Sequence, residues 1–363
     1  MRILVALLGA MIAAGCGVEK FDINSLPEGD RNTTIGDTVY IQQYPNWTGF
    51  NRPQDLMIGN EPFAYVADTE NDRVVMLDLA GRVIGSSQRI KRPIALAQDK
   101  RLQLLVCAEF DTLLPGHTAP VTFGAVYRLD LPAYQHQIGS IPPKRVYFDP
   151  TDSTRRFTGV ATLYNNQYGI ARIGPKRFFP YFDNAVLLFG KDDAFISPIT
   201  TTFSPDGTGL LSIHKLTAIA TLPTGRSLEY VFAQVEQSPD AVNKPLFKVQ
   251  WIRLVAIGQT TEFVSKFNPS TDGDIGLLQI NRFGRPEGLT LDPSGNLFVI
   301  DAEKDSLFRF SSRGVESYSF GGRGDGDRQF NQPSGVAFFD GTVYVADTGN
   351  NRIVRFKLST DLR

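Results

Sequence analysis

The sequence has few of the residues that usually build metal centres and nucleophilic active sites. Its 363 residues include three histidines, and the spacing of His117, His136 and His214 is unlike that of a zinc site. No glycine-rich phosphate loop and no nucleophile motif stands out, so no cofactor is predicted. The formal net charge of −1 indicates neither a nucleic acid nor an anionic membrane surface as a partner.

The two cysteines lie in different contexts. Cys107 stands in the apolar run LLVCA, where a small buried side chain is the simplest interpretation. Cys16 follows Arg2 and the apolar stretch Ile3–Ala14, which is too short to span a bilayer as a helix. The tetrapeptide AAGC that ends at Cys16 resembles the lipobox of bacterial lipoproteins, although alanine stands at its first position, where leucine is usual. This resemblance implies cleavage before Cys16 and acylation of its side chain; an ordinary secretory signal is the alternative.

These features divide the chain into three parts. Residues 1–15 are predicted to be a signal peptide, and residues 16–37 a lipidated cysteine followed by a polar, flexible tether. Residues 38–363 are predicted to form the folded domain. Gly17 follows the cysteine, and no aspartate stands there to signal retention at an inner membrane. An outer membrane is therefore the favoured location in an organism that has one.

The folded part of the chain is built from repeats. The clearest copy, Gln332–Phe356, reads QPSGVAFFDGTVYVADTGNNRIVRF, with three apolar or alternating runs separated by turn residues. Its Asp340-Gly341 pair fits a tight hairpin turn. Related segments, spaced roughly 40 to 70 residues apart, are typical of arrays of blades. They begin at Arg52, Arg92, Arg156, Lys215 and Arg285.

Three pieces of the repeat, P-x-G-V-A, G-x-V-Y-V-A-D and N-R-I, resemble the NHL repeat, a family of short repeats that build β-propellers. The resemblance covers about Thr38–Leu358. It implies an all-β fold: a six-bladed β-propeller, expected to be monomeric, of four-stranded antiparallel blades. It names no function, because propellers host many.

The predicted propeller needs an additional strand to close. The fifth repeat is followed by an outer strand, Val315–Phe320, whereas the sixth has no such strand after it. Thr38–Gln43 precedes the first repeat and has the composition of the missing strand. We therefore predict that it pairs with the last blade, which removes the two exposed edges of a linear array.

Aligned repeats place two recurring positions at the predicted channel mouth. The first position, just before each innermost strand, is basic in five of six repeats: Arg52, Arg92, Arg156, Lys215 and Arg285, with Gln332 in the sixth. The second position ends each second strand and includes Asp68, Arg172, Asp301 and Asp347.

One explanation of this pattern is structural, with ion pairs Arg52–Asp68 and Arg285–Asp301 inside their blades. In the third repeat, however, Arg156 and Arg172 are both basic. Two guanidiniums at a constricted mouth predict an anionic ligand, unless water or an acid outside the alignment, such as Glu109, lies between them.

A second candidate surface is an insertion in the third repeat, GPKRFFPYFD. It concentrates aromatic and basic side chains, which are the usual anchors of protein interfaces. The alternative is that its rings fold back over a neighbouring blade. The residues predicted to contact a partner are Arg177, Phe178, Phe179, Tyr181 and Phe182.

The sequence therefore favours a lipid-anchored extracytoplasmic protein whose propeller is a binding or scaffolding module for a protein or an anionic ligand. The alternative is a hydrolase or lyase with its active site at the channel mouth. For that alternative, Asp68, Asp301 and Asp347 would have to group around a metal ion.

Overall fold

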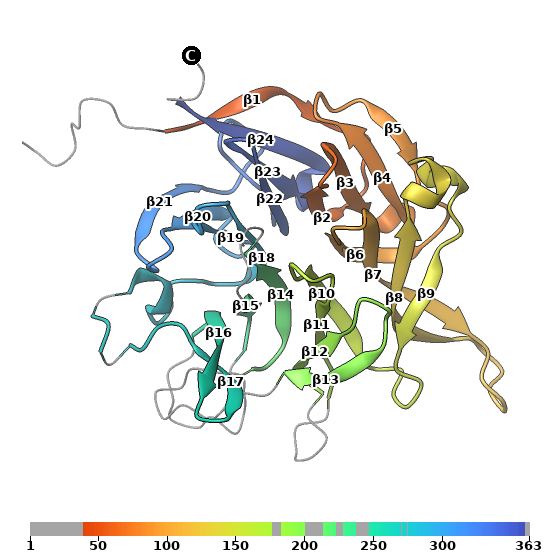
Figure 1. Cartoon of the computed structure of the whole chain (residues 1–363). Coiled ribbons are helices and arrows are strands. Elements are labelled where there is room, and N and C mark those ends of the chain that lie inside the picture. Colours follow the sequence, from red (N-terminus) through yellow and green to blue (C-terminus); the bar gives the residue numbers. More distant parts are fainter. Residues whose placement is uncertain are drawn as a thin grey trace, which may run out of the picture. The chain divides into compact units, whose positions relative to one another are not determined.

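The computed structural model describes residues 39–175, 183–199, 213–222, 228–236, 247–269, 271–273 and 275–359. Within these ranges the chain forms six four-stranded antiparallel sheets and no α-helix. The sheets are arranged as blades around a central axis (Figure 1). The predicted six-bladed β-propeller is confirmed.

The first five blades are each built from four consecutive strands. Blades 1 to 3 are β2 (Pro53–Ile58), β3 (Phe63–Asp68), β4 (Arg73–Asp78) and β5 (Val83–Ser86); β6 (Lys91–Gln98), β7 (Gln103–Thr112), β8 (Val121–Asp130) and β9 (Lys144–Phe148); and β10 (Arg156–Thr162), β11 (Tyr168–Ile173), β12 (Ala185–Phe189) and β13 (Phe195–Ile199). Blades 4 and 5 are β14 (Leu216–Thr221), β15 (Glu229–Gln234), β16 (Val249–Ile257) and β17 (Thr260–Ser265); and β18 (Pro286–Leu291), β19 (Leu297–Asp301), β20 (Ser306–Phe310) and β21 (Glu316–Gly321).

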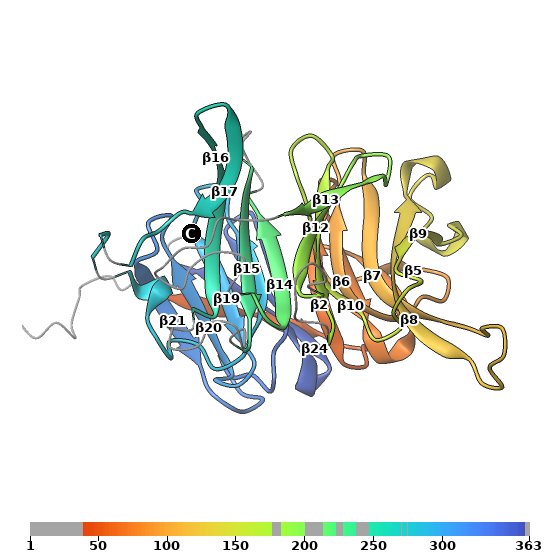
Figure 2. The same ribbon diagram turned by 90° about the horizontal axis from the view of Figure 1, so that it is seen from below.

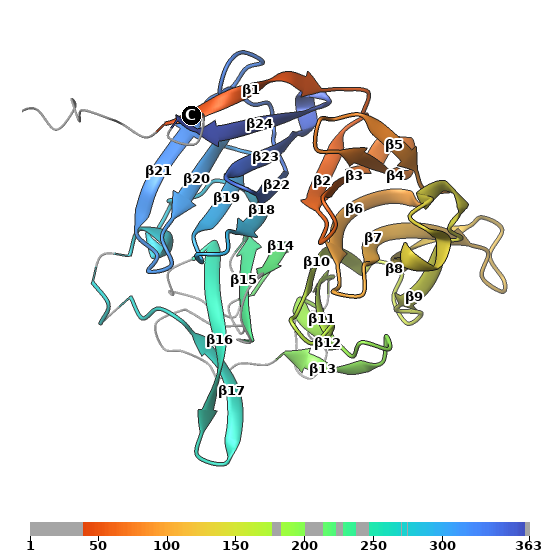
Figure 3. The ribbon, with the colours of Figure 1, turned by 45° about the horizontal axis from the view of Figure 1, so that its top comes forward.

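The sixth blade joins the two ends of the propeller. It consists of β22 (Gly335–Phe339), β23 (Thr342–Asp347) and β24 (Arg352–Leu358), with β1 (Tyr40–Trp47) as its outermost strand. Strand β1 pairs antiparallel with β24, with Tyr40 opposite Leu358, and the two strands lie side by side in Figure 3. The predicted closure by an N-terminal strand is confirmed. The Asp340-Gly341 turn also has the predicted geometry, because both residues have positive φ.

The helical segments among the described residues are short 3₁₀ helices of three residues each. Two of them follow the second strands of blades 1 and 6, directly after Asp68 and Asp347. The turns are η2 (Thr69–Asn71), η3 (Pro132–Tyr134), η4 (Ile138–Ser140), η6 (Gly276–Leu278) and η7 (Thr348–Asn350).

The hydrophobic core is divided among the interfaces between blades. Each pair of neighbouring blades encloses its own cluster of buried apolar side chains. Between blades 6 and 1, for example, Trp47 and Leu56 share a cluster with Tyr344. Each blade therefore depends on both neighbours for burial of its faces, which is why a closed ring is more stable than a linear array.

Hydroxyl groups tie the innermost strands together. The Thr158 hydroxyl donates to the Leu216 carbonyl at 2.8 Å, and the Ser334 hydroxyl donates to the Gln54 carbonyl at 2.7 Å. Innermost strands of neighbouring blades are not paired as strands. These hydrogen bonds therefore satisfy carbonyl groups that would otherwise lack a partner near the channel.

Two hairpins project from opposite faces of the propeller in the edge-on view of Figure 2. One joins β7 to β8, and these two strands pair as far as Thr112 and Val121 at its tip. A small aromatic cluster that includes Phe110 and Phe123 packs on it. The other hairpin joins β16 to β17.

Candidate functional site

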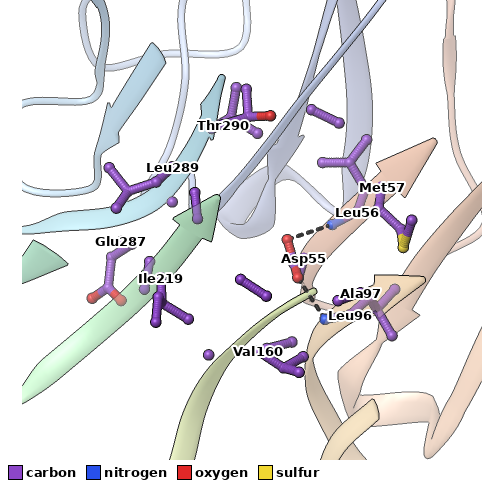
Figure 4. A pocket seen from close by; sticks show the side chains of 18 of the residues that line it. Asp55, Leu56, Met57, Leu96, Ala97, Val160, Ile219, Glu287, Leu289 and Thr290 are labelled. Carbon is purple, nitrogen blue, oxygen red and sulfur yellow. Dashed lines mark hydrogen bonds between the residues drawn. The ribbon is translucent and has the colours of Figure 1, made fainter. Parts of the chain in front are cut away.

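The central channel forms a cavity among the described residues. It has a volume of about 940 Å³ and is lined by the innermost strands of all six blades, β2, β6, β10, β14, β18 and β22. Figure 4 shows its wall, on which apolar side chains such as Leu96, Val160, Ile219 and Leu289 predominate. A cavity of this size and polarity is suited to a small, largely apolar molecule.

Asp55 is one of the acidic residues that line this wall. It lies on β2 directly after a β-bulge, because the register with β3 shifts between Pro53 and Asp55. One carboxylate oxygen, Oδ2, accepts the Leu96 N–H of the next blade at 2.8 Å, and Oδ1 accepts the Leu56 N–H at 2.8 Å. Both hydrogen bonds are drawn in Figure 4. They hold the carboxylate in one orientation at the lumen.

The surroundings of Asp55 favour its neutral form. Asp55 is partly exposed to the lumen, and protein surrounds it on its other sides. Burial raises the pKa of Asp55 to about 7, against the opposing effect of the two N–H donors. At neutral pH the channel therefore holds a carboxyl group that a small change in its surroundings can charge or discharge.

Glu287 on β18 is a second carboxylate in the channel wall (Figure 4). Burial raises its pKa, and the Arg285 guanidinium opposes this shift. The distance from Arg285 Nε to Glu287 Oε1 is 3.0 Å. Unlike Asp55, Glu287 thus has a cationic partner, which lies just before the start of its own strand.

Comparisons with known proteins agree with this architecture. The profile of the NHL repeat matches residues 330–356, which contain β22, β23 and most of β24. The last blade is an NHL repeat. The chain is thus a six-bladed β-propeller that carries an NHL repeat, in agreement with the resemblance found in the sequence. A search of curated proteins found no sequence match.

Several solved structures resemble this propeller in fold. A luciferin-regenerating enzyme is 11% identical with a TM-score of 0.57, over 88% of this chain and 95% of that one. An auxiliary nutrient binding protein from Bacteroides thetaiotaomicron is 11% identical with a TM-score of 0.55, over 85% and 70%. Regucalcin, a calcium-binding protein from Agrobacterium tumefaciens, is 12% identical with a TM-score of 0.51, over 88% and 94%. At these identities the likeness shows the fold alone, and the fold serves both binding proteins and enzymes.

The basic residues predicted at the channel mouth are largely neutralised by neighbouring carboxylates. Arg52, Lys215 and Arg285 line the channel. Four of the five basic residues form ion pairs with glutamates: Arg92 with Glu70 at 2.7 Å, Arg156 with Glu109 at 3.2 Å, Lys215 with Glu236 at 2.5 Å and Arg285 with Glu287 at 3.0 Å. The ring at the channel mouth is therefore mixed in charge rather than mainly basic.

The prediction of two unpaired guanidiniums in the third blade is wrong. Arg156 is paired with Glu109 of the second blade, the alternative that the sequence left open. Arg172 is mostly buried; its Nε donates to the Asp183 carbonyl at 2.9 Å, and its Nη1 lies 3.7 Å from Asp149 Oδ2. Burial and nearby Arg155 lower the pKa of Arg172. The argument for an anionic ligand rested on this pair and loses its basis.

The predicted aspartates are structural elements of their blades and do not face the channel. The ion pair Arg52–Asp68 is not formed; Asp68 is fully buried and pairs with Arg73 at 2.8 Å. Asp301 is also fully buried and accepts the Arg285 backbone N–H at 2.9 Å rather than its guanidinium.

Asp347 shows the same arrangement in the last blade, where it accepts the Asn331 N–H at 2.8 Å and pairs with Arg352 at 2.7 Å. The metal site that Asp68, Asp301 and Asp347 were expected to form in the enzyme alternative is not there. No group of three or more histidine, cysteine, aspartate or glutamate side chains suited to a metal ion occurs in the part of the chain that the structure describes.

The remaining predictions concern Cys107, the third-repeat insertion and the N-terminal segment. Cys107 is a buried free thiol, as expected, and burial raises its pKa. The predicted partner-binding residues Arg177, Phe178, Phe179, Tyr181 and Phe182 lie outside the described residues, as do Cys16 and the predicted signal peptide. Within the described ranges, no helix has the length and apolar character needed to cross a bilayer.

The repeats already contained a signal for Asp55 that the sequence analysis missed. In the other five repeats, the aligned position is glycine or alanine: Ala95, Gly159, Ala218, Gly288 and Gly335. An alignment of the repeats reveals positions where the same kind of residue recurs. Asp55 is instead an acidic residue at a position that is small in every other repeat.

Proposed function

We propose that this protein is a lipid-anchored, extracytoplasmic binding protein whose propeller holds a small, largely apolar ligand in its central channel. The observation that carries the proposal is the channel itself, about 940 Å³ in volume and walled mainly by apolar side chains from all six blades. Its volume lies in the range of about 300–1,000 Å³ typical of pockets for small molecules.

This proposal changes the ligand class expected from the sequence. Four of the five basic side chains near the mouth have glutamate partners, as Arg92 and Lys215 illustrate. An anionic ligand would have to compete with these carboxylates. An apolar ligand gains free energy from the channel wall without disrupting them.

Occupation of the channel can be tested with two bulky substitutions in its wall. Met57 and Thr290 both line the lumen (Figure 4). The double variant Met57→Trp/Thr290→Trp is expected to weaken the binding of n-hexanol at least tenfold, because two indole rings fill space that the ligand needs. Isothermal titration calorimetry on the full chain in lipid nanodiscs, with empty nanodiscs as the blank, measures the affinity.

The matched control introduces two tryptophans on the outer surface of the propeller instead of in the channel. Val83 and Ile84 on the outer strand β5 are 61% and 53% exposed. Val83→Trp/Ile84→Trp should bind n-hexanol like the wild type, and melting curves of both double variants establish that they are folded. Equal affinity in the wild type and the channel variant would contradict a ligand site in the channel.

Lipid attachment is supported by the sequence around Cys16, Ala13-Ala14-Gly15-Cys16. In bacteria fed an alkyne-labelled fatty acid, the wild-type chain is expected to carry the label and to sediment with membranes. Cys16→Ser should lose the label, because the thiol that is acylated is absent, whereas Cys107→Ser should retain it. Labelling of Cys16→Ser to the wild-type level would refute the anchor.

A further inference from the structure

The Asp55 carboxylate has fixed backbone donors but lacks a cationic partner among the described residues. Its two oxygens accept N–H groups from Leu56 and Leu96, and no described basic side chain forms an ion pair with it. Each carboxylate oxygen can accept more than one hydrogen bond. The group is therefore held in place with acceptor capacity left over, facing the lumen.

The wall around Asp55 supplies apolar surface rather than compensating charge. Met57, Ala97, Val160 and Ile219 are among the side chains that line this part of the channel (Figure 4). An isolated carboxylate in such surroundings is costly to ionise, in keeping with its pKa of about 7. A bound cation would provide the missing counter-charge inside the channel.

The channel's other charged groups do not meet this need. Arg285 and Lys215 line the channel but are engaged with Glu287 and Glu236. The other two basic residues of the lining, Arg52 and Lys100, form no ion pair with Asp55 and do not shift its pKa. A metal ion would need several ligands, and no suitable group of three acidic, histidine or cysteine side chains occurs among the described residues. An ammonium group, by contrast, can bind to a single carboxylate through one charge-assisted hydrogen bond.

We infer that the channel is selective for a ligand that joins an apolar body to an ammonium group, and that Asp55 binds the ammonium. This inference rests on the proposed function and specifies its ligand class. The apolar body would lie against side chains such as Val160 and Ile219, and the ammonium would donate to the free lone pairs of the Asp55 carboxylate. The backbone N–H groups of Leu56 and Leu96 would stabilise the ionised carboxylate in the complex.

Three probes of equal length separate charge from apolar surface: n-hexylammonium, n-hexanol and n-hexanoate. Titrated into the full chain in nanodiscs at pH 8, with empty nanodiscs as the blank, n-hexylammonium should bind at least tenfold more tightly than n-hexanol, and n-hexanoate should bind most weakly. In Asp55→Ala the preference for n-hexylammonium should disappear, while n-hexanol binding stays within about twofold of wild type.

The alanine variant suits this test because blades 2 and 4 have alanine at the equivalent positions, Ala95 and Ala218. The matched control is Asp325→Asn, which removes one exposed carboxylate outside the channel and should leave the preference intact. A melting curve establishes that Asp55→Ala is folded.

The pH dependence gives a second readout that a purely structural role of Asp55 would not produce. Because the pKa of Asp55 is about 7, n-hexylammonium affinity should fall about tenfold from pH 8 to pH 6, as the carboxyl must release its proton to bind the cation. The neighbouring Cys107 thiol stays neutral over this range, since burial and the Asp55 charge both raise its pKa. Affinity for n-hexanol should not change.

The outcomes distinguish this inference from the proposed function. Equal affinity for the three probes, or a preference for n-hexylammonium that persists in Asp55→Ala, would overturn the inference and leave the channel as a site for neutral apolar ligands. Failure of all three probes to bind would overturn the proposed function, and the inference with it.

Discussion

Replacing Asp347 with alanine is expected to lower the free energy of unfolding by about 3–5 kcal/mol, because removing one member of a buried ion pair leaves its partner uncompensated. The Asp347 side chain is fully buried and that of Arg352 is 10% exposed. Asp347 accepts hydrogen bonds from the Asn331 N–H at 2.8 Å, the Asn350 amide at 2.8 Å and Arg352 Nε at 2.7 Å. It thereby joins the start of the last blade to the turn after its second strand.

Denaturant unfolding followed by tryptophan fluorescence would measure this loss, since the chain has only two tryptophans, Trp47 and Trp251. Asp325→Ala is the control: its exposed side chain is removed, while its carbonyl still accepts from Arg352 Nη1. The equivalent residue in the first blade is Asp68, paired with Arg73. A loss below about 1 kcal/mol for Asp347→Ala would mean that water satisfies the Asn331, Asn350 and Arg352 donors once the carboxylate is removed. This result would contradict the cost expected for breaking a buried ion pair.

Tyr40→Ala is expected to destabilise the fold by about 3–5 kcal/mol, the usual cost of deleting a large buried aromatic side chain. Tyr40 lies on the closing strand β1 and is 2% exposed. Its ring packs on Phe298, Tyr318 and Phe320 of blade 5, with centroids 6.4, 5.5 and 6.0 Å away. Removing this ring weakens both the attachment of β1 and the contact between blades 5 and 6.

The neighbouring residue provides the control for this second variant. Ile41 is on the same strand but 40% exposed, so Ile41→Ala should change the unfolding midpoint much less than Tyr40→Ala. Loss of β1 would also expose the edge of β24, which favours aggregation. Equal midpoints for the two variants would contradict closure of the propeller by a tightly packed β1.

The fold was predictable because its determinants recur along the chain. The repeats supply strand patterns, and the Asp340-Gly341 turn fixes a hairpin by the positive φ of both residues. The closing role of β1 was predictable from the number of strands in each repeat. The last repeat has three strands instead of four, and one unassigned strand precedes the first repeat.

The candidate site was less predictable because its determinants do not recur. Glu109 reaches Arg156 from the preceding blade, and Asp149 reaches Arg172 from the segment between blades 2 and 3. Alignment within repeats cannot show such contacts between repeats. Asp55, by contrast, was visible as an acidic residue at a glycine or alanine position, and its meaning depends on the lumen that only the assembled ring creates.

The most direct test of a ligand in the channel is to locate one. Crystals of the full chain would be grown with 6-bromohexylammonium, and the anomalous signal of bromine would be mapped. The account predicts one bromine peak inside the channel, near the wall formed by Val160 and Ile219, with the ammonium at Asp55. The peak should vanish in Met57→Trp/Thr290→Trp. A peak on the outer surface, or an empty channel at a concentration that saturates binding in solution, would contradict the account.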